Sequence, residues 1–187
     1  MDGLGCLYSA GSMKCFTFQR VCAMLGAAWL VACSPGLNWR QVQLEAGSVT
    51  LLLPCKPDRA QKSVPLGGQD TVLSMVGCEA EGAMFALSVA DIGDAARAGA
   101  VLGQWQALTL SHMRASGAPS TAAFKVAGVS APPPVRVAAR GQQAEGRAIE
   151  GQALYFARGS RLYQAVVYAP RIAPDAADTF FSSIQLQ

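Results

Sequence analysis

The 187-residue chain has little charge and a single histidine. Asp, Glu, Lys and Arg make up 14% of the residues, the formal net charge is +3, and the histidine is His112. No basic run or basic patch with interleaved aromatics occurs, so nothing indicates a nucleic-acid partner. One histidine and no CxxC spacing provide too few ligands for a zinc site. The phosphate-binding patterns GxGxxG and GxxxxGK[ST] and the GxSxG nucleophile elbow are also missing. We therefore expect no bound metal, no cofactor and no catalytic activity.

The first 33 residues have the pattern of a signal peptide. An apolar stretch at 21–31 follows Lys14 and Arg20, and the run 30–33 reads Leu-Val-Ala-Cys. A secretory signal needs a basic start, an apolar core of about 7–15 residues and a small residue at its cleavage site. The stretch is shorter than the roughly 20 residues that a transmembrane helix requires. The run that ends at Cys33 is similar to the lipobox of bacterial lipoproteins.

This resemblance predicts a signal peptide at 1–32, of which 1–12 can be a misassigned start before Met13, and a lipidated tether at 33–38. The Cys33 thiol would carry a diacylglyceryl group and its amine a further chain such as palmitate, and each buried methylene contributes about 0.8 kcal/mol to anchoring. Ser34 stands where Asp would favour inner-membrane retention, so we expect the periplasmic side of the outer membrane. The alternative is an ordinary secretory signal in which Cys33 is incidental.

The remaining cysteines predict a disulfide. Three of the six cysteines lie before residue 30, which leaves Cys33, Cys55 and Cys78. With Cys33 lipidated, Cys55 and Cys78 are two thiols in an oxidising compartment. Their bond would close a loop of a little over 20 residues and contribute about 3 kcal/mol in the chain-entropy model. The alternative is a pair of buried free thiols, which pack as small hydrophobic groups.

Residues 39–187 are long enough for one domain with a sizeable core. The apolar patterning predicts a long helix at 94–114, a shorter helix that starts at Pro174, a polar loop at 56–66 and a break at 115–121. It predicts strands at 39–44, 49–53, 71–78, 83–90, 123–129, 135–139, 151–157, 162–168 and 184–186. Few helices separated by hairpins indicate an α+β class with an antiparallel sheet flanked by helices.

The long helix carries the candidate binding residues. Asp94 can cap it, Trp105 is expected to anchor the core, and His112 falls on the apolar stripe as a partly buried group. A groove between this helix and the sheet, near Trp105 and His112, would take a small ligand. The arginines in the second half of the chain could form a weak basic face or simply solvate strand edges; they are Arg136, Arg140, Arg147, Arg158 and Arg161.

Three segments resemble the PsbP-like domains, a group of α/β/α sandwiches that includes small bacterial lipoproteins. They are 53–57 (Leu-Pro-Cys-Lys-Pro), 159–167 (Gly-Ser-Arg-Leu-Tyr-Gln-Ala-Val-Val) and 180–186. In the last segment Phe180, Ser183, Ile184 and Leu186 match the family's F-x-x-S-h-x-L ending. The resemblance would span 39–186, and 117–151 departs most from the pattern. It implies a non-catalytic accessory or protein-binding domain, and the metal binding of some photosynthetic relatives does not carry over to a chain with one histidine.

The sequence thus favours a lipid-anchored periplasmic accessory domain that binds another envelope protein. The alternative function is a periplasmic lipoprotein that binds a small ligand or a lipid between its sheet and its long helix.

Overall fold

Two β-sheets and two α-helices make up residues 36–187, the part of the chain that the computed structural model describes. The large sheet has seven antiparallel strands in the order β3-β4-β5-β9-β8-β7-β6, and the small sheet has the order β1-β2-β10. The strands are β1 (Arg40–Leu44), β2 (Val49–Leu53), β3 (Asp58–Leu66), β4 (Gln69–Ala80), β5 (Ala83–Asp91), β6 (Ser116–Ala123), β7 (Val135–Gln142), β8 (Ala148–Arg158), β9 (Arg161–Ala169) and β10 (Gln185–Leu186). The helices are the short 3-10 turns η1 (Glu45–Gly47) and η2 (Ala95–Arg97), and α2 (Ala98–His112) and α3 (Pro174–Ser182). The expected α+β class is confirmed.

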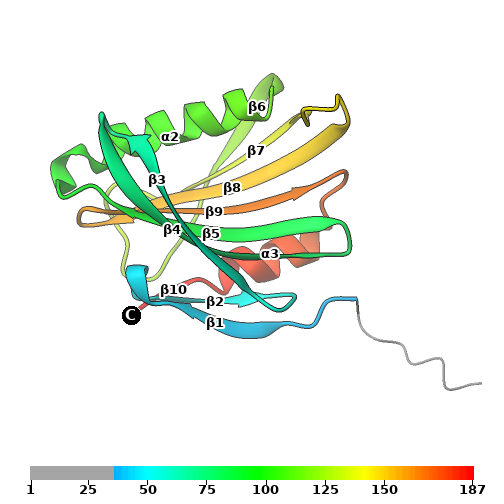
Figure 1. Cartoon of the computed structure of the whole chain (residues 1–187), viewed down its shortest axis with the longest axis horizontal. Helices are drawn as coiled ribbons and strands as arrows, with labels where there is room; N and C mark the ends of the chain where they lie inside the picture. Colours follow the sequence, from blue (N-terminus) through cyan, green and yellow to red (C-terminus); the bar gives the residue numbers. More distant parts are fainter. Residues whose placement is uncertain (1–35) are drawn as a thin grey trace, which may run out of the picture. The chain divides into compact units, whose positions relative to one another are not determined.

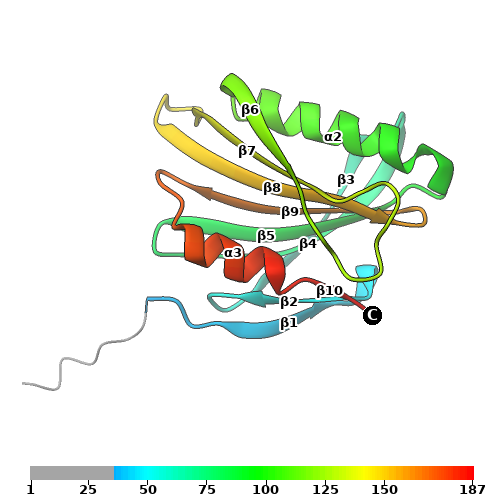
Figure 2. The same cartoon turned by 180° about the vertical axis from the view of Figure 1, so that it is seen from behind.

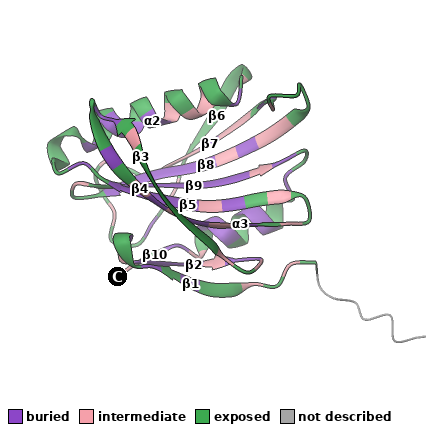
Figure 3. Cartoon of the chain, in the orientation of Figure 1, coloured by how far each residue is buried: buried purple, intermediate pink, exposed green. Residues whose placement is uncertain are grey.

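The elements form three layers. Helix α2 covers one face of the large sheet, and the small sheet together with α3 covers the other face (Figures 1 and 2). The central strand β9 is buried on both faces because its alternate side chains enter two separate cores. Tyr163 and Val167 join the core on the α3 side, whereas Leu162 and Val166 join the core under α2. Buried residues concentrate in these central strands, while the outer strands are mostly exposed (Figure 3).

Tight turns set the register of the long hairpins. Leu66 pairs with Gln69, and Ala80 pairs with Ala83, so each connection has two residues. Both residues of each turn have positive φ: 65° and 81° in the turn at 67–68, and 50° and 70° in the turn at 81–82. Two-residue hairpin turns of type I′ require positive φ at both positions, which glycine adopts without strain. The second turn is thus shorter than the four residues that separate the predicted strands 71–78 and 83–90.

The two edge strands of the large sheet correct the prediction. The expected loop at 56–66 is largely strand β3, and the expected break at 115–121 is largely strand β6. All eight β6 residues and most β3 residues are exposed, so neither strand shows the hydrophobic alternation that marks a half-buried strand. Both strands are held through the backbone ladder of a neighbouring strand. The prediction of a strand at 123–129 is wrong, because β6 ends at Ala123 and no strand follows before β7.

The C-terminal prediction agrees with the structure. Pro174 opens α3, and the side chains of Phe180 and Phe181 are fully buried against the small sheet. The Ser183 hydroxyl accepts a 2.8 Å hydrogen bond from the Leu52 backbone N–H, which occupies a β2 donor that the two-residue strand β10 does not reach. Within residues 36–187, no helix is long and apolar enough to cross a bilayer.

Candidate functional site: a cleft at the end of α2

The first described residues already make contacts with the folded domain. Cys33 and the rest of the predicted signal peptide lie outside the described residues. Leu37 packs against the core on the α3 side, and the Asn38 N–H donates a 2.8 Å hydrogen bond to the Pro54 carbonyl. Residues 37–38, the last two of the predicted tether, therefore pack against the folded domain.

The predicted disulfide between Cys55 and Cys78 is present. Cys55 follows β2 of the small sheet, Cys78 lies on β4 of the large sheet, and their Cα atoms are 5.9 Å apart. The bond links the two sheets across a sequence separation of 23 residues. It therefore holds the small sheet to the large one close to the point where the chain enters the domain.

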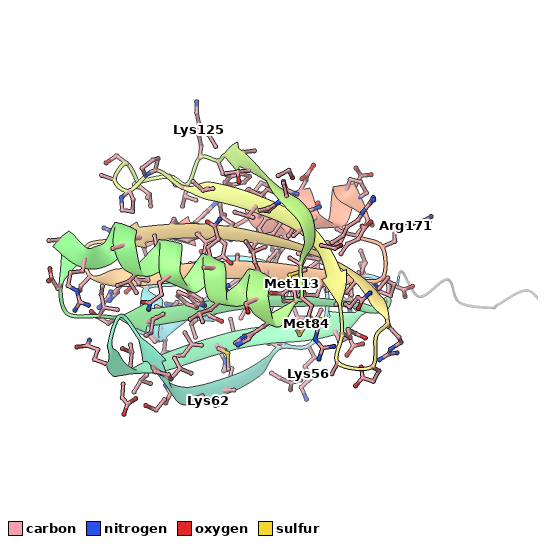
Figure 4. All side chains as sticks on the ribbon, turned by 90° about the horizontal axis from the view of Figure 1, so that it is seen from above. Lys56, Lys62, Met84, Met113, Lys125 and Arg171 are labelled. Atoms are coloured by element: carbon pink, nitrogen blue, oxygen red, sulfur yellow. A yellow bond between two sulfur atoms is a disulfide. The ribbon has the colours of Figure 1, made fainter. Side chains whose placement is uncertain are left out.

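The C-terminal end of α2 rests on two glycines of the sheet. An added Cβ at Gly141 would lie 3.0 Å from the Met113 carbonyl carbon and closer still to its oxygen. An added Cβ at Gly151 would lie 2.7 Å from the Met113 sulfur. The Met113 carbonyl also accepts a 2.8 Å hydrogen bond from the Gln142 N–H. Because glycine has no side chain, these two positions on β7 and β8 let the end of the helix approach the sheet at Met113, which Figure 4 labels.

Beside this helix end lies a cleft of about 360 Å³ between α2 and the sheet. That volume falls in the range of roughly 300–1,000 Å³ that is typical of small-molecule sites. Its walls come from the last turns of α2, from the β7–β8 connection and from β9. The lining residues are Trp105, Thr109, His112, Met113, Gln142, Gln143, Ile149, Gln164 and Tyr168.

A buried glutamine lies at the base of the cleft. Gln164 is 8% exposed, and its Nε2 donates to the Thr109 hydroxyl at 2.8 Å and to the Tyr155 hydroxyl at 3.1 Å. Thr109 in turn donates to the Trp105 carbonyl at 3.0 Å. Both donors of the amide are therefore used, and its Oε1 acceptor has no hydrogen-bond partner within residues 36–187.

The free oxygen of Gln164 faces the cleft. Among the described residues, every fully enclosed polar side-chain atom has a hydrogen-bond partner. An Oε1 without a partner must therefore be reachable from outside, and the cleft is the hollow that Gln164 lines. Tyr168 lines the same cleft, and its hydroxyl makes no hydrogen bond within residues 36–187. Burial raises the pKa of Tyr168, so this hydroxyl stays protonated and able to donate.

The two binding residues that the sequence singled out both line this cleft, but their burial differs. Trp105 is 8% exposed and anchors the core under α2, as predicted. His112 is exposed, so its predicted partial burial is wrong. The helix turns His112 outward because Met113, the next residue, takes the buried position over the two glycines. Asp94 does act as a cap, and its carboxylate accepts a 2.9 Å hydrogen bond from the Ala96 N–H at the start of η2.

The five arginines of the second half do not form one free basic face. Arg136 lies 2.6 Å from Asp178 and 4.6 Å from the centre of the Phe181 ring. Four of the arginines pair with carboxylates and the fifth donates to the Gln187 carbonyl; the pairs are Arg136–Asp178, Arg140–Glu150, Arg147–Glu145, Arg161–Asp91 and Arg158–Gln187. Of the two alternatives for these arginines, solvation of strand edges describes them better than a weak basic face.

A larger hollow of about 610 Å³ lies between the η1 region and the β3–β4 hairpin. Its buried polar side chain, Ser74, already accepts a 3.2 Å hydrogen bond from Gln61. No group of three or more histidine, cysteine or acidic side chains comes together as a metal site within residues 36–187. Of these two hollows, the cleft at the end of α2 is therefore the stronger candidate for a binding site.

Sequence reasoning missed Gln164, Thr109 and Tyr168 as members of the site. A signal for Gln164 was present, because it stands alone as a polar residue inside the apolar strand run 162–168. A polar side chain placed in a buried strand must find hydrogen-bond partners or face a cavity. The partners Thr109 and Tyr155 lie 55 and 9 residues away, so only the folded chain identifies them.

Comparisons with known proteins do not identify the chain. No family model and no curated protein matches the sequence. Among solved structures, a crystal structure from Bacteroides thetaiotaomicron has a TM-score of 0.49 at 10% identity and covers 81% of this chain and 49% of its own. The chain thus spans about half the length of that protein. A Pseudomonas aeruginosa protein of unknown function has a TM-score of 0.34 at 15% identity and covers 74% of this chain and 85% of its own. At these TM-scores the likenesses support neither a family nor a function.

Proposed function

We propose that the chain is a lipid-anchored lipoprotein with a PsbP-like domain, which faces the periplasm from the outer membrane. The observation that carries this proposal is the basic and apolar leader that ends in Leu-Val-Ala-Cys at Cys33. The Cys55–Cys78 disulfide agrees with an oxidising compartment. The arrangement of a helix, a sheet and a mixed strand-and-helix layer is compatible with the PsbP-like sandwich.

The anchor would hold the domain directly at the membrane. Cys33 precedes Gly36 by three residues, so the extended backbone limits their separation to about 11 Å. A domain held this closely meets partners at the same membrane rather than across the periplasm. We therefore propose a non-catalytic accessory role in which the domain binds another envelope protein.

The anchor is tested by the intact mass of the protein recovered from the membrane fraction. We expect a chain that starts at Cys33 and carries three acyl chains, and its loss from membranes in Cys33→Ala. Cys22→Ala is the matched control, because it alters a leader cysteine and should leave mass and location unchanged. A membrane protein with an unmodified N-terminus at another residue would refute the lipoprotein assignment.

The accessory role is tested by crosslinking in cells followed by affinity capture. One dominant envelope protein should be recovered with the wild type and weakened with Cys33→Ala, because removal of the anchor lowers its local concentration. The absence of a specific partner from either form would contradict the accessory role.

The cleft supports a second candidate function, the binding of a small ligand. It lies beside Trp105, where the sequence placed the alternative site, and one buried acceptor points into it. This candidate does not depend on the lipid anchor.

A further inference from the structure

We infer that the cleft at the end of α2 binds a neutral sugar, whose hydroxyl or acetamido N–H donates to Gln164 Oε1 while an apolar ring face lies against the floor of the cleft. The inference rests on the second candidate function above and adds the chemical class of the ligand.

The fixed acceptor defines the first requirement on the ligand. Two hydroxyl groups, those of Thr109 and Tyr155, hold the Gln164 amide by its nitrogen. The amide therefore presents an oxygen whose orientation is set before any ligand arrives. A ligand that covers this oxygen must offer it a donor, because covering it without a hydrogen bond costs about 1–3 kcal/mol.

The charge of the lining defines the second requirement. No Asp, Glu, Lys or Arg lines the cleft, and the Tyr168 hydroxyl in it stays protonated because burial raises its pKa. A charged ligand would lose hydration without gaining an opposite charge, which is unfavourable. The amides of Gln142 and Gln143 each offer donors and acceptors at the rim. This lining matches an uncharged molecule with several hydrogen-bonding groups.

The apolar part of the cleft defines the third requirement. Met113 and Ile149 contribute aliphatic surface, and the half-buried Tyr168 contributes part of its ring. A pyranose combines an apolar C–H face with a rim of hydroxyls, so a single ligand meets all three requirements. An aliphatic chain would cover the floor but leave Gln164 Oε1 and the Tyr168 hydroxyl without partners.

The test is saturation-transfer NMR on the full chain, purified in a zwitterionic detergent that has no sugar headgroup. The probes are N-acetylglucosamine, its β-1,4-linked disaccharide, maltose, glucuronate as the charged comparison and hexan-1-ol as the apolar comparison. We expect transfer to ring C–H protons of at least one neutral sugar and none to glucuronate.

Variants then assign the binding to the cleft. Gln164→Leu removes the fixed acceptor and should weaken the bound sugar at least about tenfold. Tyr168→Phe removes one hydroxyl that has no protein partner, so it should weaken binding several-fold while the fold is kept. Gln104→Met, on the exposed side of α2 and outside the cleft, is the matched control and should bind like the wild type. Ile149→Trp fills the cleft and should abolish binding.

The outcomes separate the class of ligand from the existence of the site. Sugar binding that survives both Gln164→Leu and Tyr168→Phe would overturn the inference. Hexan-1-ol binding that Ile149→Trp abolishes, with no sugar bound, would overturn the sugar class but keep the small-ligand function. No cleft-dependent binding of any probe would overturn both.

Discussion

The contact between α2 and β7 makes a quantitative prediction for Gly141→Ala. Its new Cβ would lie 3.0 Å from the Met113 carbonyl carbon and closer to the oxygen, so the helix end must retreat by roughly 1 Å. Overpacking of this kind costs about 1–3 kcal/mol. The same retreat weakens the 2.8 Å hydrogen bond from the Gln142 N–H to Met113, whose net value is about 1 kcal/mol. Alanine also restricts the unfolded chain, which offsets this by up to about 1 kcal/mol. We therefore expect Gly141→Ala to lower the free energy of unfolding by about 2 kcal/mol.

Gly103→Ala provides a matched control for this prediction. Gly103 is an exposed position of α2, and an added Cβ would meet nothing within 4 Å. Alanine there should raise the free energy of unfolding by about 0.5–1 kcal/mol, because glycine is a poor helix former. The assay is urea unfolding of oxidised protein followed by tryptophan fluorescence, with equal m-values required for the comparison. If Gly141→Ala unfolds at the same urea concentration as the wild type or later, the close approach that shapes the cleft does not exist.

Three further predictions concern stability. Replacing Cys55 and Cys78 together by alanine should lower the free energy of unfolding by about 3 kcal/mol, measured in the same assay, and equal stability with and without the bond would contradict the role given to it. Asp94→Ala should cost about 1 kcal/mol through loss of the cap, and Asp94→Asn should recover most of it. Asp91 has a pKa lowered from 3.8, chiefly by the Gly93 N–H, so its stabilisation is present above that pH and is lost as the pH falls through the lower folded-state pKa. Unfolding measured between pH 5 and about pH 2 should show a small loss that Asp91→Asn lacks, and identical pH profiles would refute the assignment.

Elements with a buried side could be predicted from the sequence, and the edge strands could not. The buried central strands leave apolar runs such as 162–168, and the helices place buried residues at helical spacing, as Val101, Leu102 and Trp105 do in α2. Strand β3 owes its conformation to its ladder with β4 and keeps charged residues such as Arg59 and Lys62 in solvent. No local pattern encodes a pairing between backbones, so such segments resemble loops in the sequence. The same reasoning explains β6.

For the candidate site, too, some features could be predicted from the sequence and others depend on the packing of distant residues. The α+β class, the Cys55–Cys78 pairing and the central place of Trp105 could be predicted from the sequence, because residue composition, the number of cysteines and helical periodicity can be read without the fold. The packing of the folded chain is needed to see that Gly141 and Gly151 admit the end of α2 and that His112 turns outward. It alone directs the free oxygen of Gln164 into a cleft, since that oxygen is defined by hydroxyl partners from two other elements. Contacts between residues far apart in the sequence form only when the layers pack, and they set the chemistry of the cleft.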